Sequence, residues 1–138
     1  MVKEVEEIHY HPIPKPSKVG KSKHRKQKTN RQKLIKKLDT IVSEKVRSVG
    51  RCDRCGKTSA LACAHIYSRR NMRLRWDLRN LLCLCYACHI HWAHRDPVAF
   101  VKWVSTFRDL DELERVLQNR TPMKVFDLEE LLKSHLRS

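Results

Sequence analysis

Residues 52–94 read CDRCGKTSALACAHIYSRRNMRLRWDLRNLLCLCYACHIHWAH and contain two C-x2-C pairs, Cys52/Cys55 and Cys85/Cys88. Four thiolates held in two tight turns suit one tetrahedral Zn²⁺ site. The pairs are separated by 29 residues, which is more than a minimal zinc ribbon needs. The sequence therefore predicts a zinc-stapled module whose long insert forms a second site.

Two further cysteines, Cys63 and Cys83, lie between the pairs. Six cysteines would also suit disulfides, but no apolar signal segment is visible at the N-terminus, so we expect metal ligation instead. Cys63 could approach a second metal, although we expect plain packing for both. The longest apolar runs are a few residues, so we expect a cytoplasmic protein with no membrane span.

Positive charge is concentrated in the first two-thirds of the chain. The chain has 30 basic residues (Lys and Arg) and 15 acidic ones (Asp and Glu). Residues 1–49 contain 14 basic and 5 acidic residues, residues 50–95 contain 9 basic and 2 acidic, and residues 96–138 contain 7 basic and 8 acidic. A field of this sign attracts polyanions, of which nucleic acid is the commonest. An anionic membrane surface has less support, because no long apolar face accompanies the charge.

The most basic stretch, residues 15–37, has eleven Lys and Arg and no acid. Such a run repels itself and buries little apolar surface, so we expect residues 1–30 to form a flexible basic arm. The arm is either a solvated tail or an electrostatic contact to DNA through residues such as Lys26 and Lys28. The arginine-rich insert downstream favours the second reading.

Apolar residues recur with a helical period from Leu34 to Val49 and predict a helix over residues 31–48. Asn30 or Thr29 can cap its start, and Gly50 can supply a left-handed end. We expect the apolar stripe to pack on the zinc module rather than to form a dimer seam, which favours a monomer.

The insert and its flanks predict the order strand, loop, strand, helix, over residues 58–66, 69–79, 80–85 and 86–94. Helix signals downstream are Asp96-Pro97 as a start, a break near Asp109, an end at Thr121-Pro122 and Asp127 as a last cap. The predicted fold is α+β and mostly helical. We expect one domain over residues 31–138, with its core at 51–97 and C-terminal helices over 97–138.

His65, Asn80 and His89 follow one another in this order inside the cysteine frame. Residues 52–97 resemble the HNH endonucleases of the His-Me, or ββα-metal, superfamily, and most of all its small phage-type members. The motifs that carry this resemblance are Cys52/Cys55, His65-Ile-Tyr-Ser68-Arg69, Arg75-Trp76-Asp77, Asn80, Cys85/Cys88-His89 and His94-x2-Pro97. They cover about a third of the chain and leave out the arm and the C-terminal helices.

The resemblance implies a role for each residue of the trio. His65 corresponds to the general base that activates water, Asn80 to the residue that pins the loop and orients that histidine, and His89 to a ligand of a catalytic divalent cation, Mg²⁺ or Mn²⁺. That cation would bind the scissile phosphate and stabilise the leaving 3′-oxygen. The products would carry 5′-phosphate and 3′-hydroxyl groups.

One position departs from many relatives, which place an acid or a histidine just before the catalytic histidine. Here that position is Ala64, so the metal must use other ligands, for which His91 and His94 are the candidates. A regular helix places His89 and His94 about 140° apart and His91 and His94 about 60° apart. We favour His89 with His94, which requires an irregular helix, and keep His91 as the alternative.

Five arginines fall within eleven residues of the insert: Arg69, Arg70, Arg73, Arg75 and Arg79. They form either a solvated loop or a phosphate clamp, for which guanidinium groups are suited. The sequence as a whole predicts an HNH DNA endonuclease of low sequence specificity. The alternatives are a non-catalytic zinc-ribbon nucleic-acid-binding protein and a structure-selective recombination or junction nuclease.

Overall fold

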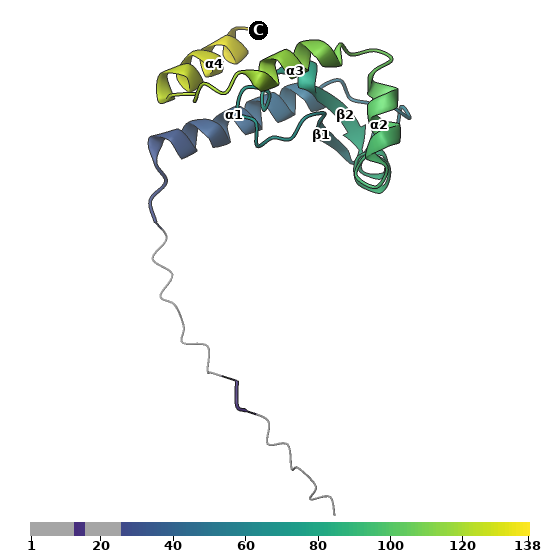
Figure 1. Cartoon of the computed structure of the whole chain (residues 1–138), viewed down its shortest axis with the longest axis horizontal. Helices are drawn as coiled ribbons and strands as arrows, with labels where there is room; N and C mark the ends of the chain where they lie inside the picture. Colours follow the sequence, from purple (N-terminus) through teal and green to yellow (C-terminus); the bar gives the residue numbers. More distant parts are fainter. Residues whose placement is uncertain (1–12, 16–25) are drawn as a thin grey trace, which may run out of the picture.

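The computed structural model describes residues 13–15 and 26–138. Its elements are α1 (Asn30–Arg47), β1 (Leu61–His65), the short 3-10 turn η1 (Leu78–Asn80), β2 (Leu81–Cys85), the π-helix η2 (Ala87–Ala93), α2 (Pro97–Val104), α3 (Leu110–Gln118) and α4 (Val125–Arg137). The predicted α+β class, with helix as the main component, is confirmed (Figure 1). Most of the predicted basic arm lies outside the described residues.

The two strands form an antiparallel hairpin in which Leu61 pairs with Cys85 and His65 with Leu81. All five residues of β2 are buried. This agrees with its continuous apolar sequence, because a strand that is covered on both faces needs no polar alternation. The hairpin is therefore the centre on which the helices pack.

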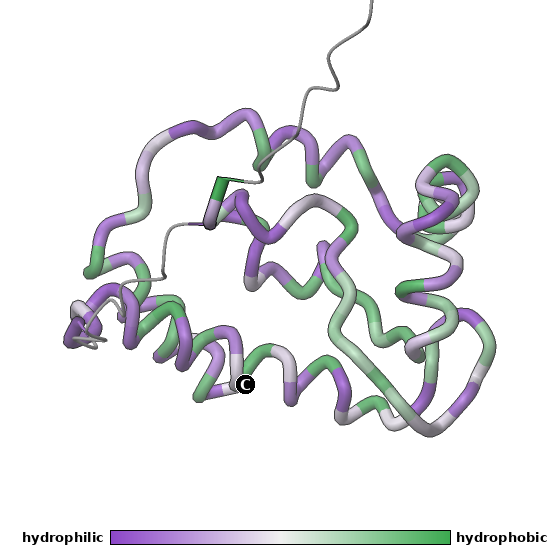
Figure 2. Tube along the Cα trace, turned by 90° about the horizontal axis from the view of Figure 1, so that it is seen from below, coloured by the Kyte–Doolittle hydropathy of each residue, from purple (hydrophilic) through white to green (hydrophobic). Residues whose placement is uncertain are grey.

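Two apolar clusters cover the two faces of this hairpin. One includes Ala64 and Leu82 with residues of η2 and α2, such as Ala93 and Phe100. The other contains Leu81 of β2 and brings together residues of α1 and α4, among them Leu38, Val42, Leu128 and Leu132. Figure 2 shows hydrophobic and hydrophilic residues alternating along the helices, as expected for helices that bury one face.

The first and last helices pack side by side and run in the same direction (Figure 1). At their starts, Nη1 of Arg31 donates to the carbonyl of Met123 at 2.6 Å. At their ends, Nζ of Lys45 donates to the carbonyl of His135 at 3.4 Å. The C-terminal helix thus covers the apolar stripe of α1, as a core role for that stripe requires.

The helix boundaries agree with the capping signals in most places. Thr29 caps α1, and Gly50 follows that helix with a φ of +78°. Asp96 and Asp109 cap α2 and α3. The predicted cap Asp127 is wrong, because α4 begins two residues earlier; Asp127 instead lies in the first turn, where its carboxylate accepts the Lys124 N–H at 2.7 Å.

Among the described residues, no helix is both long enough and apolar enough to cross a membrane.

Candidate functional site

Both cysteine pairs converge on one point. The four Sγ atoms of Cys52, Cys55, Cys85 and Cys88 all lie within 4.8 Å of one another, and those of Cys55 and Cys85 are 3.6 Å apart. Four sulfurs around a tetrahedral Zn²⁺ at about 2.3 Å would be roughly 3.8 Å apart. The cluster predicted from the sequence is therefore confirmed as a group that could hold a metal ion, and it is compatible with zinc.

Local backbone structure places these sulfurs. The N–H of Gly56 donates to the carbonyl of Cys52 at 2.9 Å, and Gly56 has a φ of +75°, which closes the first turn. Cys85 ends β2, and Cys88 lies in the first turn of η2. The hairpin and the π-helix therefore supply one pair, and the turn after α1 supplies the other.

Thiols this close cannot all ionise without a cation. Burial opposes ionisation of Cys52, but the backbone N–H groups of Cys55, Cys85 and Arg54 outweigh it and lower its pKa to about 6. Burial, followed by the effect of the other three cysteines, raises the pKa of Cys88 to about 12, against the opposing hydrogen bond from Arg54. A bound dication would remove this conflict, because coordinated thiols are deprotonated.

Two residues inside the first cysteine pair support the cluster and were not predicted. Arg54 lies over the ring of Trp92, with Cζ 3.7 Å from the ring centroid, and its Nη1 is 3.5 Å from the Sγ of Cys88. The carboxylate of Asp53 accepts the N–H of Cys83 at 2.8 Å. A cation beside four thiolates offsets their surplus negative charge, and such outer contacts orient the ligands.

Cys63 and Cys83 lie outside the metal-ligand group, opposite each other in the hairpin. Burial and then the neighbouring Cys83 raise the pKa of Cys63 to about 11, so it stays a protonated thiol. Its place outside the metal-ligand group agrees with a packing role for Cys63.

His65 ends β1, and its Nε2 lies 3.0 Å from the backbone carbonyl oxygen of Arg75. Because a carbonyl can only accept, Nε2 carries the proton and Nδ1 presents a lone pair. Burial lowers the pKa of His65 below its usual value, and the charges of Arg69 and Arg75 add to this effect. The ring is therefore held as a neutral imidazole with one free basic nitrogen, beside a cavity of about 280 Å³.

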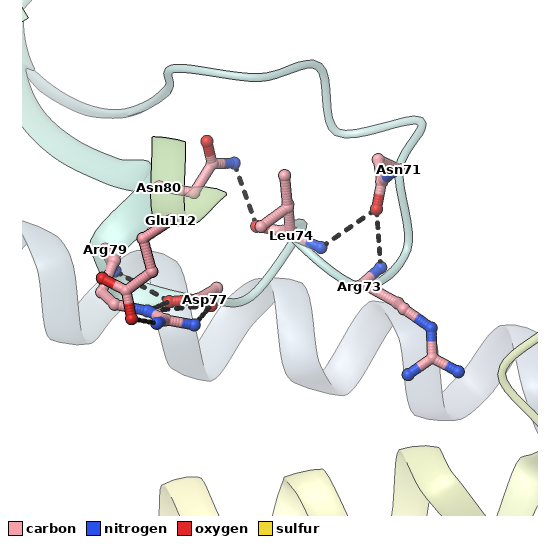
Figure 3. A network of polar contacts seen from close by, with 7 residues as sticks. All are labelled: Asn71, Arg73, Leu74, Asp77, Arg79, Asn80 and Glu112. Atoms are coloured by element: carbon pink, nitrogen blue, oxygen red, sulfur yellow. Dashed lines mark hydrogen bonds and ion pairs between the residues drawn. The ribbon is translucent and has the colours of Figure 1, made fainter. Parts of the chain in front are cut away.

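Asn80 is fully buried and uses its whole amide to hold the loop after β1. Its Oδ1 accepts the Tyr67 N–H at 2.8 Å, while Nδ2 donates to the carbonyls of Tyr67 at 3.1 Å and Leu74 at 3.0 Å. Figure 3 shows the Leu74 contact, together with Asn71, which closes the next turn of the loop. Asn80 thus pins the loop that carries the Arg75 carbonyl to His65.

His89 and His94 share one face of η2, and their ring centroids lie 4.7 Å apart. The π-helix explains this proximity, because its bonds join residues five apart, as in the Nα–H of His94 donating to the His89 carbonyl at 3.1 Å. Burial lowers the pKa of His89, and the nearby charges of His94 and His65 add to it. The geometric contact is between the rings of His89 and His94.

His91 is exposed and packs edge-on against Tyr86, with ring centroids 5.2 Å apart. Within the described part of the chain, the four cysteines are the one group of three or more possible ligands that lie so close together. A three-histidine cluster of His89, His91 and His94 is therefore not formed. Of these three histidines, His89 and His94 are the two whose rings lie next to each other.

Asp39, which was not predicted as a site residue, holds the loop after β1 against α1. Asp39 of α1 accepts from Nε of Arg75 at 2.8 Å, Nη2 of Arg75 at 2.6 Å and Nε1 of Trp76 at 2.8 Å. It is the sole carboxylate between residues 8 and 43, and an isolated acid within this basic stretch was the available signal. This clamp, next to the carbonyl that holds His65, makes Asp39 a positioning residue.

We expect Asp39→Ala to lower the free energy of unfolding by about 2–3 kcal/mol, because it removes the acceptor of Nε and Nη2 of Arg75 and of the Trp76 N–H. Burial raises the pKa of Asp39, but the bonds from Arg75 and Trp76 outweigh it and hold that pKa below 3.8. The contribution of this carboxylate to the free energy of unfolding is thus present above pH 3.8 and is lost at lower pH, as the carboxylate becomes protonated. Urea titrations at neutral and acidic pH measure both effects.

Glu130→Ala is the matched control, since it removes an acid from the exposed pair with Lys133. It should leave the unfolding midpoint almost unchanged. Equal destabilisation by the two variants would contradict the structural role assigned to Asp39.

The five loop arginines have different surroundings. Arg75 is occupied by Asp39, and Arg79 forms ion pairs with Asp77 and Glu112 (Figure 3). Arg73 donates twice to the carbonyl of Thr121, whereas Arg69 and Arg70 are exposed. Arg75 and Arg79 thus stabilise the fold, and the role of phosphate contact remains a prediction for the others.

Comparison with known proteins adds no assignment: no family model matches the chain, and no curated protein and no solved structure is detectably similar to it.

Proposed function

We propose that this protein is a metal-dependent HNH endonuclease that hydrolyses DNA phosphodiester bonds with low sequence specificity and whose cysteine cluster holds structural Zn²⁺. The observation that carries the proposal is the state of His65, a neutral ring with Nε2 fixed on a carbonyl and Nδ1 free. A general base for water needs this combination of fixed orientation and available lone pair at neutral pH.

His65 would take the proton from the attacking water through Nδ1. Its ring cannot rotate freely, since the Arg75 carbonyl that accepts from Nε2 is itself anchored through Asp39 and through the Asn80-bound loop. Each of these contacts comes from a different element, so the geometry does not depend on one flexible segment. This supports a catalytic rather than a packing role for His65.

His89 and His94 would hold the catalytic cation, which would neutralise charge on the scissile phosphate and stabilise the leaving oxygen. Their ring separation of 4.7 Å suits two ligands on one ion. Ala64, at the position where many HNH endonucleases carry another ligand, is buried in the apolar cluster against η2. Because two imidazoles without a third protein ligand suit transition metals better than Mg²⁺, we expect Mn²⁺ to support faster cleavage than Mg²⁺.

Relaxation of supercoiled plasmid DNA in the presence of Mg²⁺ or Mn²⁺ tests the proposal. The negative control omits the added cation rather than using a strong chelator, which would also strip the cysteine site. His89→Ala and His94→Ala should lose cleavage, and raised Mn²⁺ should partly restore it. His91→Ala is the matched control on the same helix and should cut at the wild-type rate; a loss equal to that of His89→Ala would refute the assigned ligand pair.

A non-catalytic zinc-stapled nucleic-acid-binding protein is the second candidate. It is favoured by the fact that only the cysteine cluster, among the described residues, brings three or more possible metal ligands together. Tight DNA binding without cleavage under any divalent cation would select it. Cleavage confined to branched DNA would instead select a structure-selective nuclease.

Removal of residues 1–28 should weaken DNA binding and flatten its dependence on salt, because fewer counterions are released. The removed segment contains Lys26 and Lys28 and most of the basic run. Anisotropy titrations of labelled duplex DNA at several salt concentrations measure this slope. An unchanged slope would show that the segment is a solvated tail.

A further inference from the structure

A second basic feature lies away from the histidines, where the start of α1, the loop after β1 and the connection from α3 to α4 meet. A cavity of about 310 Å³ at this junction is lined by four arginines, Arg31, Arg70, Arg73 and Arg120. None of the described residues that line it is acidic. Two of these arginines lie outside the segment that resembles a known family, so the HNH motifs do not account for the cavity.

Two of the four guanidinium groups are held in place without being neutralised. Nη1 of Arg31 donates to the carbonyl of Met123 at 2.6 Å, and Nε and Nη2 of Arg73 donate to the carbonyl of Thr121 at 3.1 and 2.9 Å. A carbonyl accepts one or two N–H groups of a guanidinium but does not neutralise its positive charge, and the remaining N–H donors stay available to a ligand. Figure 3 shows Arg73 pointing away from the ion pairs of Arg79.

The other two arginines of the cavity are exposed and available. Among the described residues, the side chains of Arg70 and Arg120 have no hydrogen-bond or ion-pair partner, unlike those of Arg31 and Arg73. An exposed arginine without a protein partner can present a planar pair of donors to a phosphate. The cavity thus combines two oriented cations with two adaptable ones.

This cavity adjoins a larger one of about 670 Å³, with which it shares Arg73, Asn119 and Met123. The larger cavity adds the cation Arg115; Arg79 and Glu112, which also line it, are paired with each other. We call the two cavities together the basic groove. An open groove with cations along its length suits a chain of phosphates better than one enclosed anion.

We propose that the basic groove binds consecutive backbone phosphates of DNA, as a contact separate from the His65 site. The proposal rests on the proposed function for the identity of the ligand, but it does not require cleavage. Bound there, DNA would contact α1 and the α3–α4 connection as well as the insert. The groove would therefore contribute affinity without reading bases.

The test compares two double variants with the same change of net charge. Arg70→Gln/Arg120→Gln removes the adaptable groove cations. The control, Arg51→Gln/Arg137→Gln, removes two exposed cations that do not line the groove, Arg51 four residues after α1 and Arg137 at the end of α4. Binding of a labelled DNA duplex of about 20 base pairs is followed by anisotropy between about 50 and 200 mM salt, without added divalent cation. Zinc content and thermal unfolding verify that each variant is folded.

We expect the groove variant to bind about tenfold more weakly and to lose roughly 1–2 units of the salt slope, as for two lost phosphate contacts. The control pair should change affinity by less than about twofold. The proposal is overturned if both double variants lose the same DNA affinity, or if the groove variant binds as tightly as the wild type. It is also overturned if the wild type does not bind the duplex. In a parallel titration with anionic vesicles, a groove variant that loses vesicle binding but keeps DNA binding would also overturn it.

These outcomes are distinct from those for the nuclease. Groove-dependent binding by a wild-type protein that never cuts plasmid would reject the endonuclease and keep the groove. Cleavage by a groove variant that binds DNA as tightly as wild type would reject the groove alone.

Discussion

His65→Ala should slow DNA cleavage by roughly 10²–10⁴-fold, the usual contribution of a general base, and leave DNA affinity and zinc content intact. The reason is local: Nε2 is held on the carbonyl of Arg75, so Nδ1 is the proton acceptor, and alanine has neither nitrogen. Added Mn²⁺ should not restore this variant, since the missing function is proton transfer rather than metal binding. Single-turnover cleavage of plasmid with saturating enzyme measures the effect.

The wild-type rate should also depend on pH in a defined way. Burial and the charges of Arg69 and Arg75 place the pKa of His65 below 6.5. The base is active when neutral, so the rate should rise with pH up to that pKa and be level by pH 7. A folded His65→Ala protein that cuts at the wild-type rate would reject this assignment and leave the non-catalytic binder.

Cys85→Ser should abolish zinc binding and cooperative folding together. Cys85 is 1 % exposed at the end of β2, and its Sγ lies 3.6 Å from that of Cys55. Apparent binding energies of structural zinc are roughly 10–16 kcal/mol, which exceeds the stability of most small domains. Elemental analysis and thermal unfolding followed by circular dichroism measure both losses.

Cys83→Ser is the matched control for this experiment, because Cys83 is also buried in β2 but lies outside the metal-ligand group. It should keep one zinc per chain and an unfolding transition, at a lower temperature. A well-folded wild-type protein without zinc would exclude the structural metal.

The sequence predicted the parts of the fold that depend on local signals. Thr29, Gly50 and Asp96 act at helix ends through contacts with their neighbours, so their residue types alone placed α1 and α2. Residues 80–85 were predicted as a short strand, and Leu81–Cys85 form β2. The two C-x2-C pairs indicated one cluster, because each pair forms a single turn.

Features set by tertiary contacts could not be read in the same way. The π-helix that unites His89 with His94 has no distinct residue pattern, and a regular helix would have separated them. The partners of the arginines lie far away in sequence, such as Asp39 for Arg75 and Thr121 for Arg73. Five similar residues in one loop therefore acquired different surroundings.

The parallel packing of α1 and α4 has a consequence for synthesis on the ribosome. The contacts of Arg31 and Lys45 join residues 92 and 90 positions apart. The apolar stripe of α1 can therefore be covered only after the residues of α4, 90 or more positions downstream, have been translated, and long-range closure of this kind slows folding. The stripe stays exposed in the nascent chain until α4 emerges, and exposed apolar surface of this kind favours aggregation unless a chaperone binds it.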